Sequence, residues 1–88
     1  MGGSVKRLAV LGSTGSIGQQ TLDVVRSFPD RFQIIGLAGG RNTELLIRQI
    51  EEFRPKLVSI SDGRLPGPGY ETSSLEKLAS HPEVDLVV

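Results

Sequence analysis

Residues 8–18 read Leu8-Ala9-Val10-Leu11-Gly12-Ser13-Thr14-Gly15-Ser16-Ile17-Gly18, and this stretch decides the fold. An apolar run ends in three glycines with the spacing G-x-x-G-x-x-G, and a helix-like pattern follows at once. Glycines permit a tight turn and let a pyrophosphate approach backbone N–H groups, while the next helix directs its positive dipole end toward the phosphates. The stretch therefore predicts a nucleotide phosphate site between a strand and a helix.

Strands and helices alternate along the rest of the chain. Continuous apolar runs predict buried parallel strands, and apolar residues at helical spacing predict amphipathic helices that end near prolines. The expected strands are Lys6–Leu11, Phe32–Ala38, Lys56–Ile60 and Asp85–Val88. The expected helices begin at Ser16, at Asn42 or Thr43, and at Ser73. The segment from Ser61 to Thr72, rich in glycine and proline, predicts a loop.

Apolar spacing also predicts which helix faces are buried. The buried positions expected in the first helix are Ile17, Thr21, Val24, Val25 and Phe28. Those expected in the second helix are Leu46, Ile50 and Phe53. Ser73 and Glu76 have the spacing of a capping box, which predicts the start of the third helix.

This alternation predicts an α/β fold, a Rossmann-like doubly wound parallel sheet. The third, second, first and fourth strands lie side by side in that order (3-2-1-4), and the sheet is truncated after the fourth strand. A ligand is expected at the carboxyl ends of the strands, where the order reverses. Residues 1–88 are expected to be part of one nucleotide-binding domain. Met1-Gly2-Gly3-Ser4 is typical of a tag remnant or a disordered tail and lies outside the fold.

Composition excludes several function classes. The formal net charge is zero, with ten basic and ten acidic residues, which argues against nucleic acid or an anionic membrane as a partner. The absence of cysteine excludes disulfides, thiolate metal sites and a cysteine nucleophile. No apolar run approaches the roughly 20 residues that cross a bilayer, and the N-terminus lacks a signal-peptide core, so we expect an intracellular protein.

Two groups of residues are candidates for binding a cofactor. The glycine loop offers backbone N–H groups and three hydroxyls, although the hydroxyls alternatively only cap the turn and the helix. After the second strand there is no acid to hold ribose hydroxyls, whereas Arg41 can pair with a 2′-phosphate, which favours NADPH over NADH. Alternatively, Arg41 is a solvated loop arginine. The candidates are Gly12, Ser13, Thr14, Gly15, Ser16, Ile17, Gly18, Gly40, Arg41 and Asn42.

No catalytic or metal-binding residue emerges from the sequence. His81 has no partners at ligand spacing, so it is expected to be a residue at a helix C-terminus. Asp62 and Glu71 fall near the ligand end of the sheet, but isolated loop carboxylates are usually solvated. No nucleophile and base can be paired in this chain.

The segment Leu11–Gly18, with Thr21-Leu22-Asp23-Val24-Val25 and Gly40-Arg41-Asn42, resembles the N-terminal NADPH-binding domain of the 1-deoxy-D-xylulose 5-phosphate reductoisomerase family. The resemblance implies that Thr14, Gly15, Ser16 and Ile17 contact the cofactor's phosphates. It places Gly40, Arg41 and Asn42 at the adenosine 2′-phosphate, where the family often has lysine in place of the arginine.

The resemblance also implies an activity for the full-length enzyme. Such enzymes make 2-C-methyl-D-erythritol 4-phosphate from a phosphosugar substrate, in the non-mevalonate route to isoprenoids, by a rearrangement and a reduction. They use NADPH and a divalent metal, Mg²⁺ or Mn²⁺, and are inhibited by fosmidomycin. A homodimer in the bacterial cytoplasm, or in a plastid for a plant or alga, is expected.

The resemblance spans nearly the whole chain, but the chain corresponds to the first part of such an enzyme. The Asn-Lys-Glu segment, the acidic metal ligands, the active-site lid and the C-terminal helices are missing. We therefore expect the catalytic and C-terminal domains to be absent and this chain to be inactive alone. Three other interpretations remain open: a stand-alone nucleotide-binding or regulatory module, the N-terminal part of a short-chain dehydrogenase, and a structural domain with an empty loop.

Overall fold

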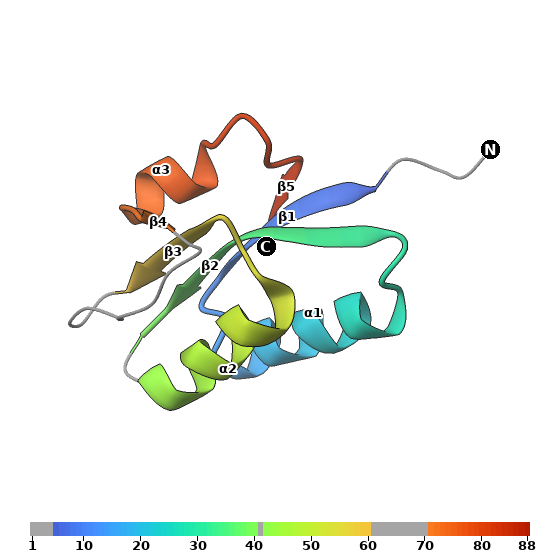
Figure 1. The fold of residues 1–88 in the computed structure, drawn as a ribbon, viewed down its shortest axis with the longest axis horizontal. Coiled ribbons are helices and arrows are strands. Elements are labelled where there is room, and N and C mark those ends of the chain that lie inside the picture. Colours follow the sequence, from blue (N-terminus) through green and yellow to red (C-terminus); the bar gives the residue numbers. More distant parts are fainter. Residues whose placement is uncertain (1–4, 41, 61–70) are drawn as a thin grey trace.

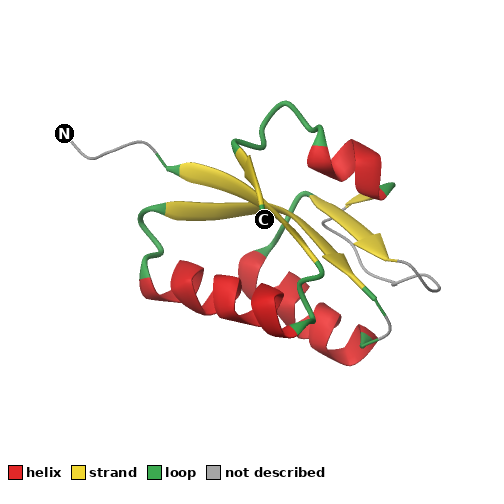
Figure 2. Ribbon diagram, turned by 180° about the vertical axis from the view of Figure 1, so that it is seen from behind, coloured by secondary structure: helices red, strands yellow, loops and turns green. Residues whose placement is uncertain are grey.

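A parallel sheet lies between two layers of helices in the computed structural model, which describes residues 5–40, 42–60 and 71–88 (Figures 1 and 2). Helices α1 (Ser16–Ser27) and α2 (Thr43–Phe53) cover one face, and the short α3 (Leu75–Ala79) covers the other. The strands are β1 (Lys6–Leu11), β2 (Phe32–Gly39), β3 (Leu57–Ile60), β4 (Glu71–Thr72) and β5 (Leu86–Val87). None of the helices in the described residues is long and apolar enough to cross a membrane.

The sheet order is β4-β3-β2-β1-β5, and every adjacent pair is parallel. The four expected strands therefore take the predicted order 3-2-1-4 and the α/β Rossmann-like fold is confirmed. The prediction of a loop through Thr72 is wrong at its end, because Glu71 and Thr72 pair with Leu57 and Val58 as β4. A strand of two residues is too short to show a hydrophobic period. The rest of that expected loop, residues 61–70 with Asp62, lies outside the described residues.

The core explains why the strands read as continuous apolar runs. In β1, Leu8 and Val10 pack with the side chains of α1 and α2, while Ala9 belongs to the cluster on the α3 face. Successive strand residues point to opposite faces, so a sheet covered on both sides needs apolar residues at every position. Residues 34–39 of β2, the central strand, are all buried for the same reason.

The buried face of α1 differs from the predicted one. Its buried residues are Gly18, Leu22 and Val25, whereas Ile17 is 75 % exposed and Val24 and Phe28 are each 50 % exposed. The helix is turned so that Gly18 and Leu22 face the sheet. Two adjacent stripes of this helix are apolar, and the helical period alone does not say which one faces inward.

Helix α2 follows the prediction more closely. Leu46 is buried, and Ile50 and Phe53 are half-buried against the core. Asn42 is the N-cap, and its side-chain oxygen accepts a hydrogen bond of 3.2 Å from the Leu45 N–H. Arg54 ends the helix in the left-handed conformation, with φ of 50°.

The cap of α3 lies one residue later than predicted. Ser74, not Ser73, is the N-cap, because its hydroxyl oxygen accepts a hydrogen bond from the Lys77 N–H at 3.2 Å. The Ser73 hydroxyl instead donates to the Ser74 carbonyl. The predicted capping box of Ser73 and Glu76 is therefore wrong, although the helix itself is confirmed.

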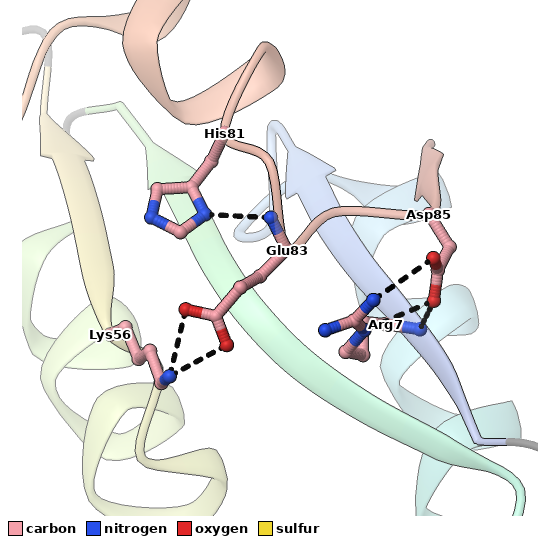
Figure 3. Close-up of polar contacts among 5 residues, drawn as sticks. All are labelled: Arg7, Lys56, His81, Glu83 and Asp85. Carbon is pink, nitrogen blue, oxygen red and sulfur yellow. Dashed lines mark hydrogen bonds and ion pairs between the residues drawn. The ribbon is translucent and has the colours of Figure 1, made fainter.

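Ion pairs tie the segment after α3 to the sheet (Figure 3). Arg7 of β1 pairs with Asp85 at 3.2 Å, and Lys56 pairs with Glu83 at 2.7 Å. Hydrogen bonding to Arg7 lowers the pKa of Asp85, and hydrogen bonding to Lys56 lowers the pKa of Glu83. His81 accepts a hydrogen bond from the Glu83 N–H at its Nδ1 atom, so in this structure it organises the turn before β5.

Candidate nucleotide-binding site

The glycine loop lies at the carboxyl end of β1, between the ends of β2 and β5. Helices α1 and α2, which flank β2 in the chain, lie on one face of the sheet, while α3, which precedes β5, lies on the other (Figure 1). The helical connections on the two sides of β1 therefore cross opposite faces of the sheet. Doubly wound sheets bind ligands in the crevice that forms at such a point.

Two glycines make the loop and the helix fit together. Gly12 has φ of +69°, which side chains rarely adopt, and its carbonyl accepts a hydrogen bond of 3.0 Å from the Gly15 N–H. A Cβ atom on Gly18 would lie only 2.2 Å from the Gly12 carbonyl oxygen and 2.6 Å from the Ser13 Cα. Only glycine at position 18 lets the first turn of α1 pack directly on the loop.

The first turn of α1 is available to an anion. Gly15 is its N-cap, and no side chain in the described ranges caps this helix, whereas Asn42 caps α2 and Ser74 caps α3. Gly15, Ser16 and Ile17 are exposed at this helix start. The initial N–H groups of a helix have no intrahelical acceptors and lie at the positive end of the dipole, so this arrangement suits a phosphate.

Ser13 is oriented differently from the other two hydroxyl residues of the loop. Its side chain is 0 % exposed, so the hydroxyl does not face a surface-bound phosphate as the sequence suggested. Its N–H donates to the Ala38 carbonyl at 2.8 Å. Thr14 is half-buried and Ser16 is exposed, so these two residues are more accessible to a ligand than Ser13.

Two of the second group of candidates, Gly40 and Asn42, follow β2, the strand that pairs with β1. Ala38 pairs with Leu11 across the two strands, and Gly40 and Asn42 come next in the chain. Asn42 is exposed at the start of α2. Arg41, the candidate for the 2′-phosphate, lies outside the described residues.

Gln49 is a residue of this site that the sequence analysis missed. It lies on α2, is only 3 % exposed, and its side-chain Nε2 donates to the Ser13 carbonyl at 2.8 Å. The available signal was its position three residues after Leu46, on the apolar face of the helix. A polar side chain at such a position indicates a buried hydrogen bond.

We also searched the described residues for side chains that could bind a metal ion. Within residues 5–40, 42–60 and 71–88 there is no group of three or more His, Cys, Asp or Glu side chains that could hold a metal ion. The described residues therefore fit a nucleotide phosphate but offer no divalent metal site.

Comparison with protein families gives a specific match. The family model described as 1-deoxy-D-xylulose 5-phosphate reductoisomerase matches residues 8–67. The enzyme of this name from Anaeromyxobacter sp. (strain K) is 48 % identical over 96 aligned positions, covering 96 % of this chain and 24 % of that relative. The one from Thermosynechococcus vestitus is 64 % identical over 58 positions, covering 66 % and 14 %.

Comparison with solved structures gives the same family as the comparison of sequences. A DOX-P reductoisomerase in complex with NADPH, fosmidomycin and magnesium superimposes with a TM-score of 0.83 at 29 % identity, over 94 % of this chain and 24 % of that one. The reductoisomerase from Zymomonas mobilis in complex with NADPH gives a TM-score of 0.65 at 30 % identity, over 96 % and 21 %. The chain thus spans about a quarter of the length of these relatives.

Proposed function

The chain belongs to the 1-deoxy-D-xylulose 5-phosphate reductoisomerase family, and from that membership we propose that it forms part of the NADPH-binding domain of such an enzyme. The full-length protein would convert 1-deoxy-D-xylulose 5-phosphate into 2-C-methyl-D-erythritol 4-phosphate with NADPH and a divalent metal. The catalytic and C-terminal domains would lie outside these 88 residues.

The packing of Gly18 on the glycine loop is the observation that best supports cofactor binding. Gly18 packs on the Gly12 carbonyl so closely that a Cβ atom would lie at 2.2 Å, and this brings the start of α1 onto the loop. Such packing supports the proposal, because a pyrophosphate could approach the backbone N–H groups without side chains in the way. Two of the similar solved structures are complexes with NADPH, which supports the same cofactor here.

We assign the pyrophosphate to the loop Gly12–Gly18, with Thr14, Gly15, Ser16 and Ile17 in contact with it. Ser13 would serve as the buried anchor of this loop rather than as a hydroxyl donor, because its side chain is enclosed. Gly40, Arg41 and Asn42 would hold the adenosine 2′-phosphate, with the arginine forming a bidentate pair.

The cofactor preference is tested by titrating NADPH and NADH into wild type, Arg41→Ala and Arg31→Ala. Arg31 is an exposed arginine before the amino end of β2, away from the loop, and serves as the matched control. We expect Arg41→Ala to weaken NADPH binding about tenfold or more and to leave NADH nearly unchanged, since a charged hydrogen bond contributes about 1.5–3 kcal/mol. Equal losses for both cofactors would rule out the 2′-phosphate role.

The proposed reductoisomerase activity of the full-length enzyme is tested separately from cofactor binding. The chain alone, given substrate, NADPH and Mg²⁺, should oxidise no more NADPH than a mock-purified sample. A chimera in which it replaces the matching segment of the Thermosynechococcus vestitus enzyme should be active. Metal-dependent turnover by the isolated chain would contradict this assignment, and NADPH binding without activity in the chimera would favour a stand-alone nucleotide-binding module.

The proposed partners and location follow from the same assignment. We propose a phosphosugar substrate and a homodimer for the full-length enzyme. Its compartment would be the bacterial cytoplasm, or a plastid in a plant or alga. The relatives named above are bacterial, which supports the first location.

A further inference from the structure

We propose that Gln49 is a positioning residue that holds the phosphate loop in its binding conformation, an inference that rests on the NADPH site proposed above. The side chain acts through Ser13 and does not touch the cofactor. Its amide links α2, which carries one end of the proposed site, to the loop that forms the other end.

The hydrogen bonds of Ser13 carry the argument. Its N–H donates to the Ala38 carbonyl of β2 at 2.8 Å, and its carbonyl accepts from Gln49 Nε2 at 2.8 Å. Both backbone groups of this residue are thus held, one by the sheet and the other by α2. Because peptide groups are planar, holding these two groups fixes the orientation of the loop backbone on both sides of Ser13.

The cost of burying Gln49 argues against a role in packing alone. The residue is 3 % exposed, and its Oε1 atom has no hydrogen-bond partner among the residues that the structure describes. An amide oxygen without a partner is unfavourable in the interior, and an apolar side chain of similar length would avoid that cost. The favourable contribution is the hydrogen bond to the Ser13 carbonyl, which is directed at the loop.

The position of Gln49 on α2 connects the two ends of the proposed site. Asn42 caps the start of the same helix, and Gln49 lies about two turns later. A helix is a rigid connector over this length, so the Gln49 bond sets the spacing between the residues after β2 and the loop after β1. NADPH, which has to reach both, would sense a change in that spacing.

The test compares Gln49→Met with Leu78→Val, a core variant on the opposite face of the sheet. Two quantities are measured: the dissociation constant for NADPH, and amide hydrogen exchange of Thr14–Gly18 without ligand. We expect Gln49→Met to weaken NADPH binding about tenfold, the equivalent of one hydrogen bond, and to accelerate exchange in the loop. Leu78→Val should change neither quantity. An unchanged loop exchange rate and an unchanged affinity in Gln49→Met would overturn the inference.

A second variant, Gln49→Glu, adds a signature that a purely structural role would not give. A buried carboxyl group has a raised pKa, so it should be protonated in mildly acidic solution and then donate to the Ser13 carbonyl as the amide does. At higher pH the carboxylate repels that carbonyl. We expect the affinity ratio of variant to wild type to approach one at pH 5.5 and to fall at pH 8. A ratio independent of pH would contradict the inference.

Asp23, Arg26, Arg48 and Glu52 line the same surface cavity as Gln49 in both proteins. The ratio to wild type removes the effect of these charges on the cofactor itself, and their effect on the introduced carboxyl group is part of the pH dependence that is measured. The two proposals also fail separately. If wild type does not bind NADPH, the proposed cofactor site fails, while the exchange rates still decide whether Gln49 positions the loop. If Gln49→Met does not fold, the pH series of Gln49→Glu decides.

Discussion

Gly15 and Gly18 belong to the same loop region, but the space around their Cα atoms differs. A Cβ atom at Gly18 would lie 2.2 Å from backbone, whereas at Gly15 it would meet the Gly12 carbonyl at 3.4 Å, an ordinary contact. Gly15 has φ of −82°, which any residue adopts. Packing therefore requires glycine at position 18 but not at position 15, where we attribute the glycine to the proposed approach of the cofactor.

Alanine at these two positions should separate stability from binding. We expect Gly18→Ala to lower the free energy of unfolding by about 1–3 kcal/mol, because the backbone has to shift, and to abolish NADPH binding. Gly15→Ala should keep the stability of wild type within about 0.5 kcal/mol and still weaken NADPH binding. Urea unfolding followed by circular dichroism, together with NADPH titration, measures both. A Gly18→Ala protein as stable as wild type would contradict the packing argument.

At the scale of elements, β2 receives helices on both faces because it has glycine where each helix approaches. A Cβ atom on Gly36 would lie 2.7 Å from Leu78 Cγ of α3, and one on Gly39 would lie 2.9 Å from Leu46 Cδ2 of α2. The two glycines are three residues apart and so face opposite sides of the sheet. The layered arrangement in Figure 2 depends on these two close approaches.

A double-mutant cycle tests the contact between Gly36 and Leu78. Gly36→Ala should cost about 1–3 kcal/mol through overpacking, and Leu78→Ala about 2–5 kcal/mol through the cavity it leaves. The double variant should be less destabilised than the sum by about 0.5–3 kcal/mol, because the new methyl group occupies part of that cavity. Gly39→Ala with Leu78→Ala is the control, and these two should be additive since they lie on opposite faces. Additivity of Gly36→Ala with Leu78→Ala would refute the direct contact.

At the scale of the whole molecule, ion pairs join the segment after α3 to β1 and to Lys56, the residue before β3. Arg7 and Lys56 lower the pKa values of Asp85 and Glu83 below the ordinary 3.8 and 4.5. A carboxyl group whose pKa is lower in the folded state binds protons more readily when the chain is unfolded. The stabilisation is therefore complete above about pH 5.5 and decreases as the pH falls through the ordinary values to the lowered ones.

We expect the urea midpoint of wild type to fall between pH 5 and pH 3, and to fall less steeply in Asp85→Asn, which has no carboxyl to protonate. The difference should shrink in 1 M salt, because the pairs are largely exposed and ions screen them. Asp30→Asn, at an exposed turn, is the matched control. An Asp85→Asn protein with the pH dependence of wild type would show that the Arg7 pair contributes nothing to stability.

Local signals in the sequence predicted most of this fold. Continuous apolar runs predicted β1, β2 and β3 to within a residue, and Asn42 and Pro55 marked the limits of α2. The signal was weaker where two neighbouring residues were equally suitable. Ser73 and Ser74 both suit a cap, and Ile17 and Leu22 lie on adjacent apolar stripes of α1, so only the packed structure distinguishes between them.

By itself, the sequence determined the strand, the glycine turn and the helix start, because those depend on residues adjacent in the chain and on backbone conformations that glycine permits. It also determined the order of the four expected strands through the alternation of strands and helices, whereas β4 appeared only in the structure. Only the tertiary structure decided that Ser13 points inward and that Gln49 holds its carbonyl. These residues are 36 positions apart, and their contact exists only after α2 has packed on the sheet beside the loop.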